Sequence, residues 1–109
     1  MARAYNDQIA DWASADPKRL FPAGVLPLHN PLMAAEELHR VAKLGFPVGL
    51  IRPVDIQGRY PNQASITPLW RAFEETGLVC AMHGLVFPNN HLGTATPRQW
   101  TPGQVVQRR

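Results

Sequence analysis

Residues 30–53, NPLMAAEELHRVAKLGFPVGLIRP, carry the clearest structural pattern in this chain. Asn30 can cap a helix, Pro31 suits its first position, and Gly45 suits the residue after its end. Between these signals an apolar stripe recurs at helical spacing, formed by Ala34, Leu38, Val41 and Ala42. The stretch that follows, residues 46–53, is apolar up to Arg52 and Pro53, which is typical of a buried strand that ends there. This stretch therefore predicts a helix that leads directly into a strand.

The same order recurs on both sides of that stretch. Downstream, TPLWRAFEETG (67–77) has a proline near its start and a closing glycine, and the apolar run GLVCAMHG (77–84) follows it. Upstream, a helical pattern at residues 5–13 precedes the short apolar stretch FPAGVLPLH (21–29). The apolar stripe of that first helix is formed by Tyr5, Ile9, Trp12 and Ala13. The order αβαβαβ predicts an α/β fold with three parallel strands and helices on one face.

Parallel strands end at one rim, and His29, Arg52 and His83 each follow the end of a predicted strand. In α/β sheets and barrels this rim is where ligands bind. A lone histidine at a strand end is more often a hydrogen-bonded packing residue than a ligand, and His29 can simply support the turn into the next helix. Arg52 can hold a substrate carboxylate or pair with the nearby Asp55.

The remaining polar residues suggest no site of their own. His39 is expected to be solvated, and His91 lies in a loop without metal-ligand spacing to His83. Four carboxylates are expected to be surface charges of helices: Glu36, Glu37, Glu74 and Glu75. Residues 85–109 are rich in proline, glycine, asparagine and threonine without periodicity, so they are expected to form a loop or disordered tail after a folded segment 1–84.

Composition excludes several classes of protein. The chain has 109 residues, a net charge of +3 and basic residues scattered among acidic ones, so we expect one small domain that does not bind nucleic acid. An apolar stretch long enough for a signal peptide or a membrane span is absent. Cys80, the single cysteine, sits in an apolar run and is expected to be a buried structural thiol. We therefore expect a cytoplasmic protein without a membrane partner.

Residues 5–84, about three quarters of the chain, resemble the middle of the amidohydrolase-related (amidohydrolase 2) family of metal-dependent hydrolases and decarboxylases. An ordered series of loose motifs carries the resemblance: YND opening a helix, DPKRL before a strand, then A-x-E-L-x-R, LGF, PLW, and an apolar strand that ends in histidine. The resemblance implies a (β/α)8 TIM barrel. Because such a barrel typically needs about 250 residues, the chain corresponds to an incomplete barrel.

The resemblance also implies a divalent metal, commonly zinc, held by strand-end histidines and an aspartate. His83 matches the family's ligand at the end of the middle strand, whereas the other ligands have no match in this chain. One hypothesis is therefore a fragment of a metal-dependent hydrolase for amide, ester or carboxylate small molecules, inactive alone. Arg52 and His29 would then contact the substrate.

The alternative is a noncatalytic α/β interaction or assembly module that holds no metal. In either case the open edges of a three-stranded sheet can pair with other chains. The apolar side chains of the helix at 67–77 are also expected to stay partly exposed: Leu69, Trp70 and Phe73. We therefore expect self-association or a complementing chain.

Overall fold

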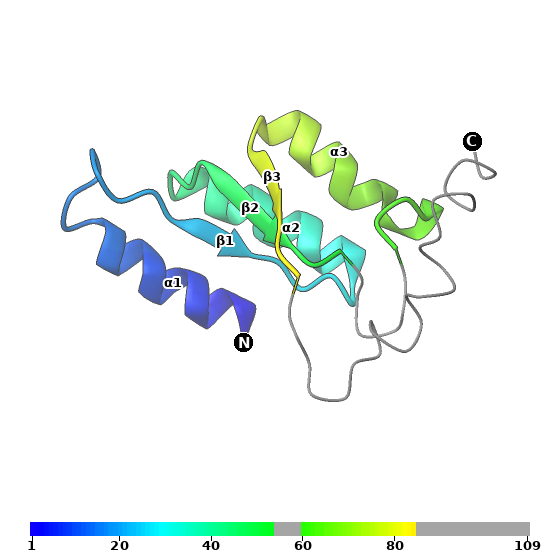
Figure 1. Cartoon of the computed structure of the whole chain (residues 1–109), viewed down its shortest axis with the longest axis horizontal. Coiled ribbons are helices and arrows are strands. Elements are labelled where there is room, and N and C mark those ends of the chain that lie inside the picture. Colours follow the sequence, from blue (N-terminus) through cyan, green and yellow to red (C-terminus); the bar gives the residue numbers. More distant parts are fainter. Residues whose placement is uncertain (54–59, 85–109) are drawn as a thin grey trace.

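The computed structural model of the chain describes residues 1–53 and 60–84. Its helices are α1 (Ala2–Ala13), α2 (Pro31–Lys43) and α3 (Thr67–Thr76), and a short 3-10 turn, η1 (Ala64–Ile66), precedes α3. Its strands are β1 (Ala23–Val25), β2 (Val48–Ile51) and β3 (Val79–Met82). Helices and strands alternate along the chain, as the sequence predicts (Figure 1).

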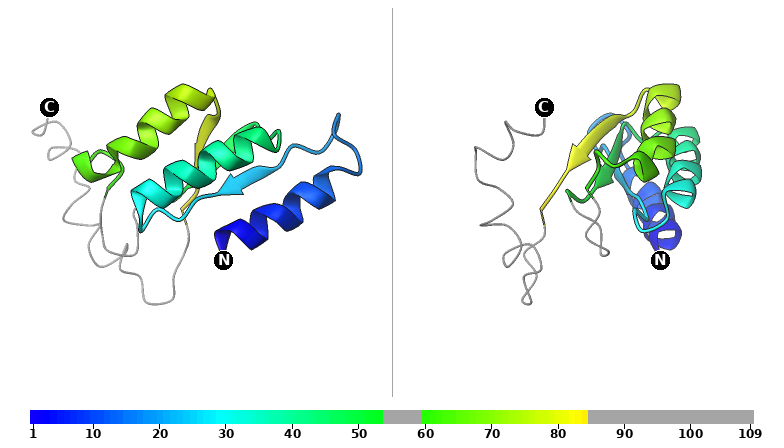
Figure 2. Two further views of the ribbon diagram at one scale, coloured as in Figure 1. Left: turned by 180° about the vertical axis from the view of Figure 1, so that it is seen from behind. Right: turned by 90° about the vertical axis from the view of Figure 1, so that its right-hand side faces the viewer.

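The three strands form one parallel sheet in the order β1-β2-β3. Gly49 at the centre is level with Gly24 on one side and Cys80 on the other. All three helices lie on the same side of the sheet (Figure 2), and within the described residues the opposite face carries no helix. The predicted parallel α/β segment is confirmed, and its uncovered face corresponds to the face that lines the interior of a (β/α)8 barrel.

Helix boundaries follow the expected signals. The Asn30 side chain accepts a hydrogen bond from the Met33 N–H at 3.2 Å and so caps α2. Gly77 ends α3 with φ of 70°, in the left-handed region that favours glycine, and its N–H donates to the Phe73 carbonyl at 2.9 Å. These local contacts explain why α2 and α3 begin and end close to the predicted positions.

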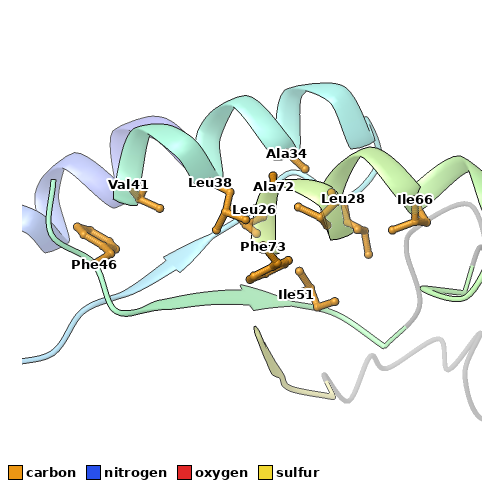
Figure 3. Close-up of a cluster of buried hydrophobic side chains, with 11 residues drawn as sticks. Leu26, Leu28, Ala34, Leu38, Val41, Phe46, Ile51, Ile66, Ala72 and Phe73 are labelled. Carbon is orange, nitrogen blue, oxygen red and sulfur yellow. The ribbon is translucent and has the colours of Figure 1, made fainter. Parts of the chain in front are cut away.

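The core lies between the sheet and the layer of α2 and α3 (Figure 3). It consists of Leu26, Leu28, Ala34, Leu38, Val41, Phe46, Ile51, Ile66, Leu69, Ala72 and Phe73. Gly49 allows the layers to approach closely, because a Cβ there would lie 2.7 Å from Leu38 Cδ1 and 2.9 Å from Phe73 Cε1. A side chain at the centre of β2 would therefore force the helices away from the sheet.

The expectation that the apolar side chains of α3 stay partly exposed is wrong for Leu69 and Phe73 and correct for Trp70. Leu69 and Phe73 are buried because α3 packs on α2, and the Phe73 ring lies over Gly49 of β2. Trp70 is half-buried, and its indole N–H donates to the Pro61 carbonyl at 2.7 Å. The outer strand β3, by contrast, exposes two apolar side chains, Val79 at 63% and Met82 at 54%.

The predicted apolar stripe of α1 is only partly correct. Ala13 is buried and Ile9 half-buried, but Tyr5 and Trp12 are exposed because α1 contacts the sheet mainly through β1, at its edge. Such a contact buries only a narrow stripe of the helix. The polar residue Asn6 occupies its centre and is fully buried.

The single cysteine, Cys80, is expected from the sequence to be a buried structural thiol. Cys80 is half-buried against the core rather than fully buried, and this burial raises the pKa of its thiol.

Among the helices of residues 1–53 and 60–84, none combines the length and the apolar character that crossing a bilayer requires. The predicted tail, residues 85–109, lies outside the described residues, as do Asp55 and His91.

Candidate functional site

The rim at the carboxyl ends of the strands is the candidate site. Because the strands are parallel and adjacent, the segments after Val25, Ile51 and Met82 all emerge at this rim. Arg52 directly follows β2 and His83 directly follows β3, whereas His29 lies four positions after β1, in a turn. The structure thus delivers all three predicted site residues to one end of the sheet.

Arg52 and His83 are neighbours across the β2–β3 ladder. Ile51 is level with Met82, and the His83 N–H donates to the Ile51 carbonyl at 3.2 Å, so the ladder continues into the next pair of positions. Side chains alternate between the two faces of a strand. Ile51 points into the helix-covered core (Figure 3), so Arg52 and His83 occupy positions on the uncovered face. Adjacent strands lie about 4.8 Å apart, which puts these two positions within reach of one small ligand.

His29 and Arg52, but not His83, line a groove of about 770 Å³. The first turn of α1, the segment after β1, and α2 form its walls. Its charged lining consists of Arg3, Arg40, Arg52, Glu36 and Glu37, beside the apolar Leu28 and Met33. His29 is exposed and Arg52 half-buried. An apolar groove with guanidinium groups at its wall suits a small organic carboxylate.

His83 is exposed at the rim and can offer one imidazole to a metal ion. Among residues 1–53 and 60–84, no three histidine, cysteine or carboxylate side chains come together in a group that could hold a metal. A catalytic zinc usually takes three protein ligands. His83 therefore could supply one ligand of a metal site, and the remaining ligands would have to come from outside the described residues.

A buried polar network beside the rim is the feature that the sequence reasoning missed. Glu37, expected on the surface, is buried, and its carboxylate accepts hydrogen bonds from Asn6 Nδ2 at 2.8 Å and from Arg40. Arg40 also contacts Asp7. A signal was available: Glu37 lies within the spacing Ala34, Leu38, Val41, so it shares the buried stripe of α2.

Mutual charge stabilisation governs the pKa values in this network. Hydrogen bonds from Arg40, and less strongly from Asn6, lower the pKa of Glu37 despite the opposing effect of burial. The hydrogen bonds to Glu37 and Asp7 raise the pKa of Arg40. Both groups are therefore charged at neutral pH, and the network is a fixed ion pair.

Outside the rim, His39 lies on α2 with its Nε2 3.1 Å from Glu75 Oε2 on α3. The Glu75 side chain is exposed and the His39 side chain is partly exposed, so His39 is in contact with solvent and also has a carboxylate neighbour. This pair links two helices on the side of the molecule away from the uncovered sheet face. His39 thus offers a control histidine for experiments on His83.

Comparisons with known proteins find similar sequences and folds in proteins named as decarboxylases. A family model described as amidohydrolase matches residues 1–106. The 2-amino-3-carboxymuconate-6-semialdehyde decarboxylase of Dictyostelium discoideum is 29% identical over 104 residues, which are 94% of this chain and 28% of that protein.

Two solved structures are similar as well. The 5-carboxyvanillate decarboxylase of Novosphingobium aromaticivorans, with bound manganese, is 30% identical with a TM-score of 0.75 over 85% of this chain and 27% of its own. The 2,6-dihydroxybenzoate decarboxylase of Rhizobium is 27% identical with a TM-score of 0.72 over 93% and 34% of the two chains. This chain thus spans about a quarter to a third of the length of the relatives it matches.

Proposed function

Because this chain belongs to the amidohydrolase family, we propose that it supplies part of the barrel of a metal-dependent decarboxylase. The observation that carries the proposal is the position of Arg52 and His83, side by side at the carboxyl end of a parallel sheet. Similar proteins named as decarboxylases support decarboxylation over the hydrolysis of amides and esters.

In this proposal His83 contributes one imidazole to a divalent metal site. Manganese is the ion in the 5-carboxyvanillate decarboxylase, whereas zinc is the ion that the family resemblance implies. When bound, the metal would act as a Lewis acid that polarises substrate oxygen atoms. The other ligands would come from barrel strands outside the described residues.

Arg52 and His29 are proposed to bind and orient the substrate. The planar guanidinium of Arg52 can hold a carboxylate through two parallel hydrogen bonds, and the half-buried position strengthens that attraction relative to bulk water. His29, exposed on the same groove, can donate or accept a hydrogen bond at the far end of a small ligand. In the reaction the bond to the carboxylate carbon breaks, carbon dioxide leaves, and a proton replaces it.

A chimaera tests this proposal. In the 5-carboxyvanillate decarboxylase, the segment that matches residues 1–84 would be replaced by residues 1–84 of this chain. We expect the chimaera to bind manganese and to release carbon dioxide from 5-carboxyvanillate. His83→Ala should lower manganese binding at least about tenfold, since one of a few ligands is lost, while the control His39→Ala should leave it unchanged.

A folded chimaera that binds manganese equally well with His83→Ala would refute the assignment of His83. A chimaera with normal manganese binding whose activity is insensitive to Arg52→Met would refute only the role of Arg52. Metal content and turnover thus separate the two assignments.

The noncatalytic α/β interaction or assembly module remains the second candidate. It is favoured by the eleven-residue core, which the sheet, α2, α3 and the segments that connect them bury among themselves. A core of this kind can hold the segment together as a unit without further strands. A chimaera that folds but neither binds manganese nor turns over substrate would support this candidate.

A further inference from the structure

Asn6 is a fully buried polar residue on a helix that is otherwise largely exposed. Its side-chain amide makes three hydrogen bonds. Oδ1 accepts from the Val25 N–H at 2.8 Å, and Nδ2 donates to the Val25 carbonyl at 2.9 Å and to Glu37 Oε1 at 2.8 Å. One side chain thus satisfies both backbone groups of a single residue in β1.

Val25 is the residue of β1 at which a neighbouring strand would be expected to bind. Successive residues of a strand turn their backbone groups to opposite edges. The Leu26 N–H donates to the Leu50 carbonyl in β2 at 3.4 Å, so Val25 turns its own groups to the outer edge of the sheet. An outer edge presents unsatisfied donors and acceptors to any strand that approaches. The carboxamide of Asn6 carries the same donor and acceptor as a peptide unit.

Glu37 and Arg40 on α2 fix the orientation of the Asn6 amide. Glu37 accepts the second Nδ2 proton, and Arg40 fixes the Glu37 carboxylate with two hydrogen bonds of 2.9 and 2.7 Å. Arg40 also reaches back to α1, where it contacts Asp7 and donates to the Arg3 carbonyl at 3.3 Å. The network therefore ties α1, β1 and α2 together at the rim end of β1.

We propose that Asn6 is a positioning residue that ends hydrogen bonding on the outer edge of β1 at Val25. A strand lying beside β1 can bond to Ala23, but at Val25 it meets groups that Asn6 already occupies. The groove beside His29 and Arg52, whose lining includes Val25, consequently stays open to a ligand rather than being filled by a strand. This inference does not depend on the proposed decarboxylase activity.

Amide hydrogen exchange of the full chain, resolved by residue with mass spectrometry, tests the proposal in monomers and oligomers alike. The quantity to compare is the exchange rate of Val25 relative to Val79, whose N–H donates to Pro47 at the other side of the sheet. We expect Val25 to be protected in the wild type. Asn6→Leu, which fills the volume without hydrogen bonds, should raise the Val25 to Val79 ratio about tenfold, the effect of one lost hydrogen bond.

Asn6→Asp, made together with Glu37→Gln, distinguishes hydrogen bonding from packing. Its carboxylate still accepts from the Val25 N–H, and the amide introduced at position 37 can donate to it where the charged Glu37 carboxylate would repel it. The ratio should therefore stay near the wild-type value in this double variant, even if both rates rise with lower global stability. Asn30→Ala, which removes a capping asparagine elsewhere, should leave the ratio unchanged.

The proposal is overturned if Val25 in the wild type exchanges as fast as an exposed amide. It is equally overturned if Asn6→Leu leaves the ratio unchanged, or if the double variant raises it as much as Asn6→Leu does. Should Asn6→Leu fail to fold, the wild-type protection and the ratio in the double variant decide the matter.

Discussion

The Glu37 carboxylate and the Arg40 guanidinium, three residues apart on α2, form an ion pair with two hydrogen bonds. Arg40 Nε donates to Oε2 at 2.9 Å and Nη2 donates to Oε1 at 2.7 Å. Glu37 is only 8% exposed, so its charge depends on this partner rather than on water. Bidentate pairs of this kind are among the stronger hydrogen-bonded contacts in proteins.

Neutralising Glu37 should destabilise the fold. Glu37→Gln removes the charge that Arg40 needs and leaves part of the guanidinium without an acceptor, so we expect a loss of about 1–3 kcal/mol in the free energy of unfolding. The adjacent, exposed Glu36→Gln is the matched control and should change stability by less than about 0.5 kcal/mol. Urea denaturation measures both, and equal effects of the two variants would contradict the special role of Glu37.

The same pair makes stability depend on pH. The pKa of Glu37 is lowered in the folded state, below its ordinary value of 4.5. The unfolded state therefore binds a proton more readily, and the contribution of the pair is fully present above pH 4.5 and lost as the pH falls through the lower folded value. We expect the wild type to lose more stability than Glu37→Gln between pH 5 and pH 3 (about two units around that pKa). Urea denaturation at each pH measures the free energy of unfolding of both proteins. If it falls equally with pH in the wild type and in Glu37→Gln, the pH dependence does not come from Glu37.

Gly49→Ala should disrupt the contact between the sheet and the helices. The new Cβ would lie 2.7 Å from Leu38 Cδ1 and 2.9 Å from the Phe73 ring, so overpacking should cost about 1–3 kcal/mol. Gly84→Ala is the control, because a Cβ at Gly84 meets no described atom within 4 Å. In thermal unfolding, the melting temperature of Gly49→Ala should lie well below those of Gly84→Ala and the wild type. Similar melting temperatures would contradict the close packing at Gly49.

The purified chain by itself should be catalytically inactive. One imidazole at the rim does not hold a catalytic metal, which usually needs three protein ligands. We expect neither simple esters and amides nor 2,6-dihydroxybenzoate to be turned over, with or without added manganese. Turnover that a chelator and His83→Ala both abolish would show that the chain completes a metal site.

We expect the isolated chain to associate with itself through β3. This strand exposes Val79 and Met82, and no strand among residues 1–53 and 60–84 pairs with its outer edge. Val79→Lys places a charge on that edge and should shift the chain toward monomer, whereas the control Leu32→Lys on the exposed surface of α2 should not. Sedimentation velocity measures both, and a wild-type monomer at tens of micromolar (far above the usual dissociation constants of stable dimers) would contradict the expectation.

Much of the fold could be read from local patterns. The caps and glycines around Pro31–Lys43, the helical spacing of apolar residues, and the short apolar runs between them each depend on neighbours a few positions away. The alternation of three helices and three strands then leaves a parallel sheet as the favoured arrangement. The rim positions of His29, Arg52 and His83 follow from that topology alone.

Tertiary structure decided which polar and apolar groups are buried. Asn6 finds its partners 19 residues away at Val25 and 31 residues away at Glu37, and periodicity gives no information on such pairings. Leu69 and Phe73 are buried because α3 packs on α2. Tyr5 and Trp12 also recur at helical spacing, but they are exposed because α1 meets only the edge of the sheet. Spacing along a helix determines which residues share a face, but the elements packed against that face determine how much of it is removed from water.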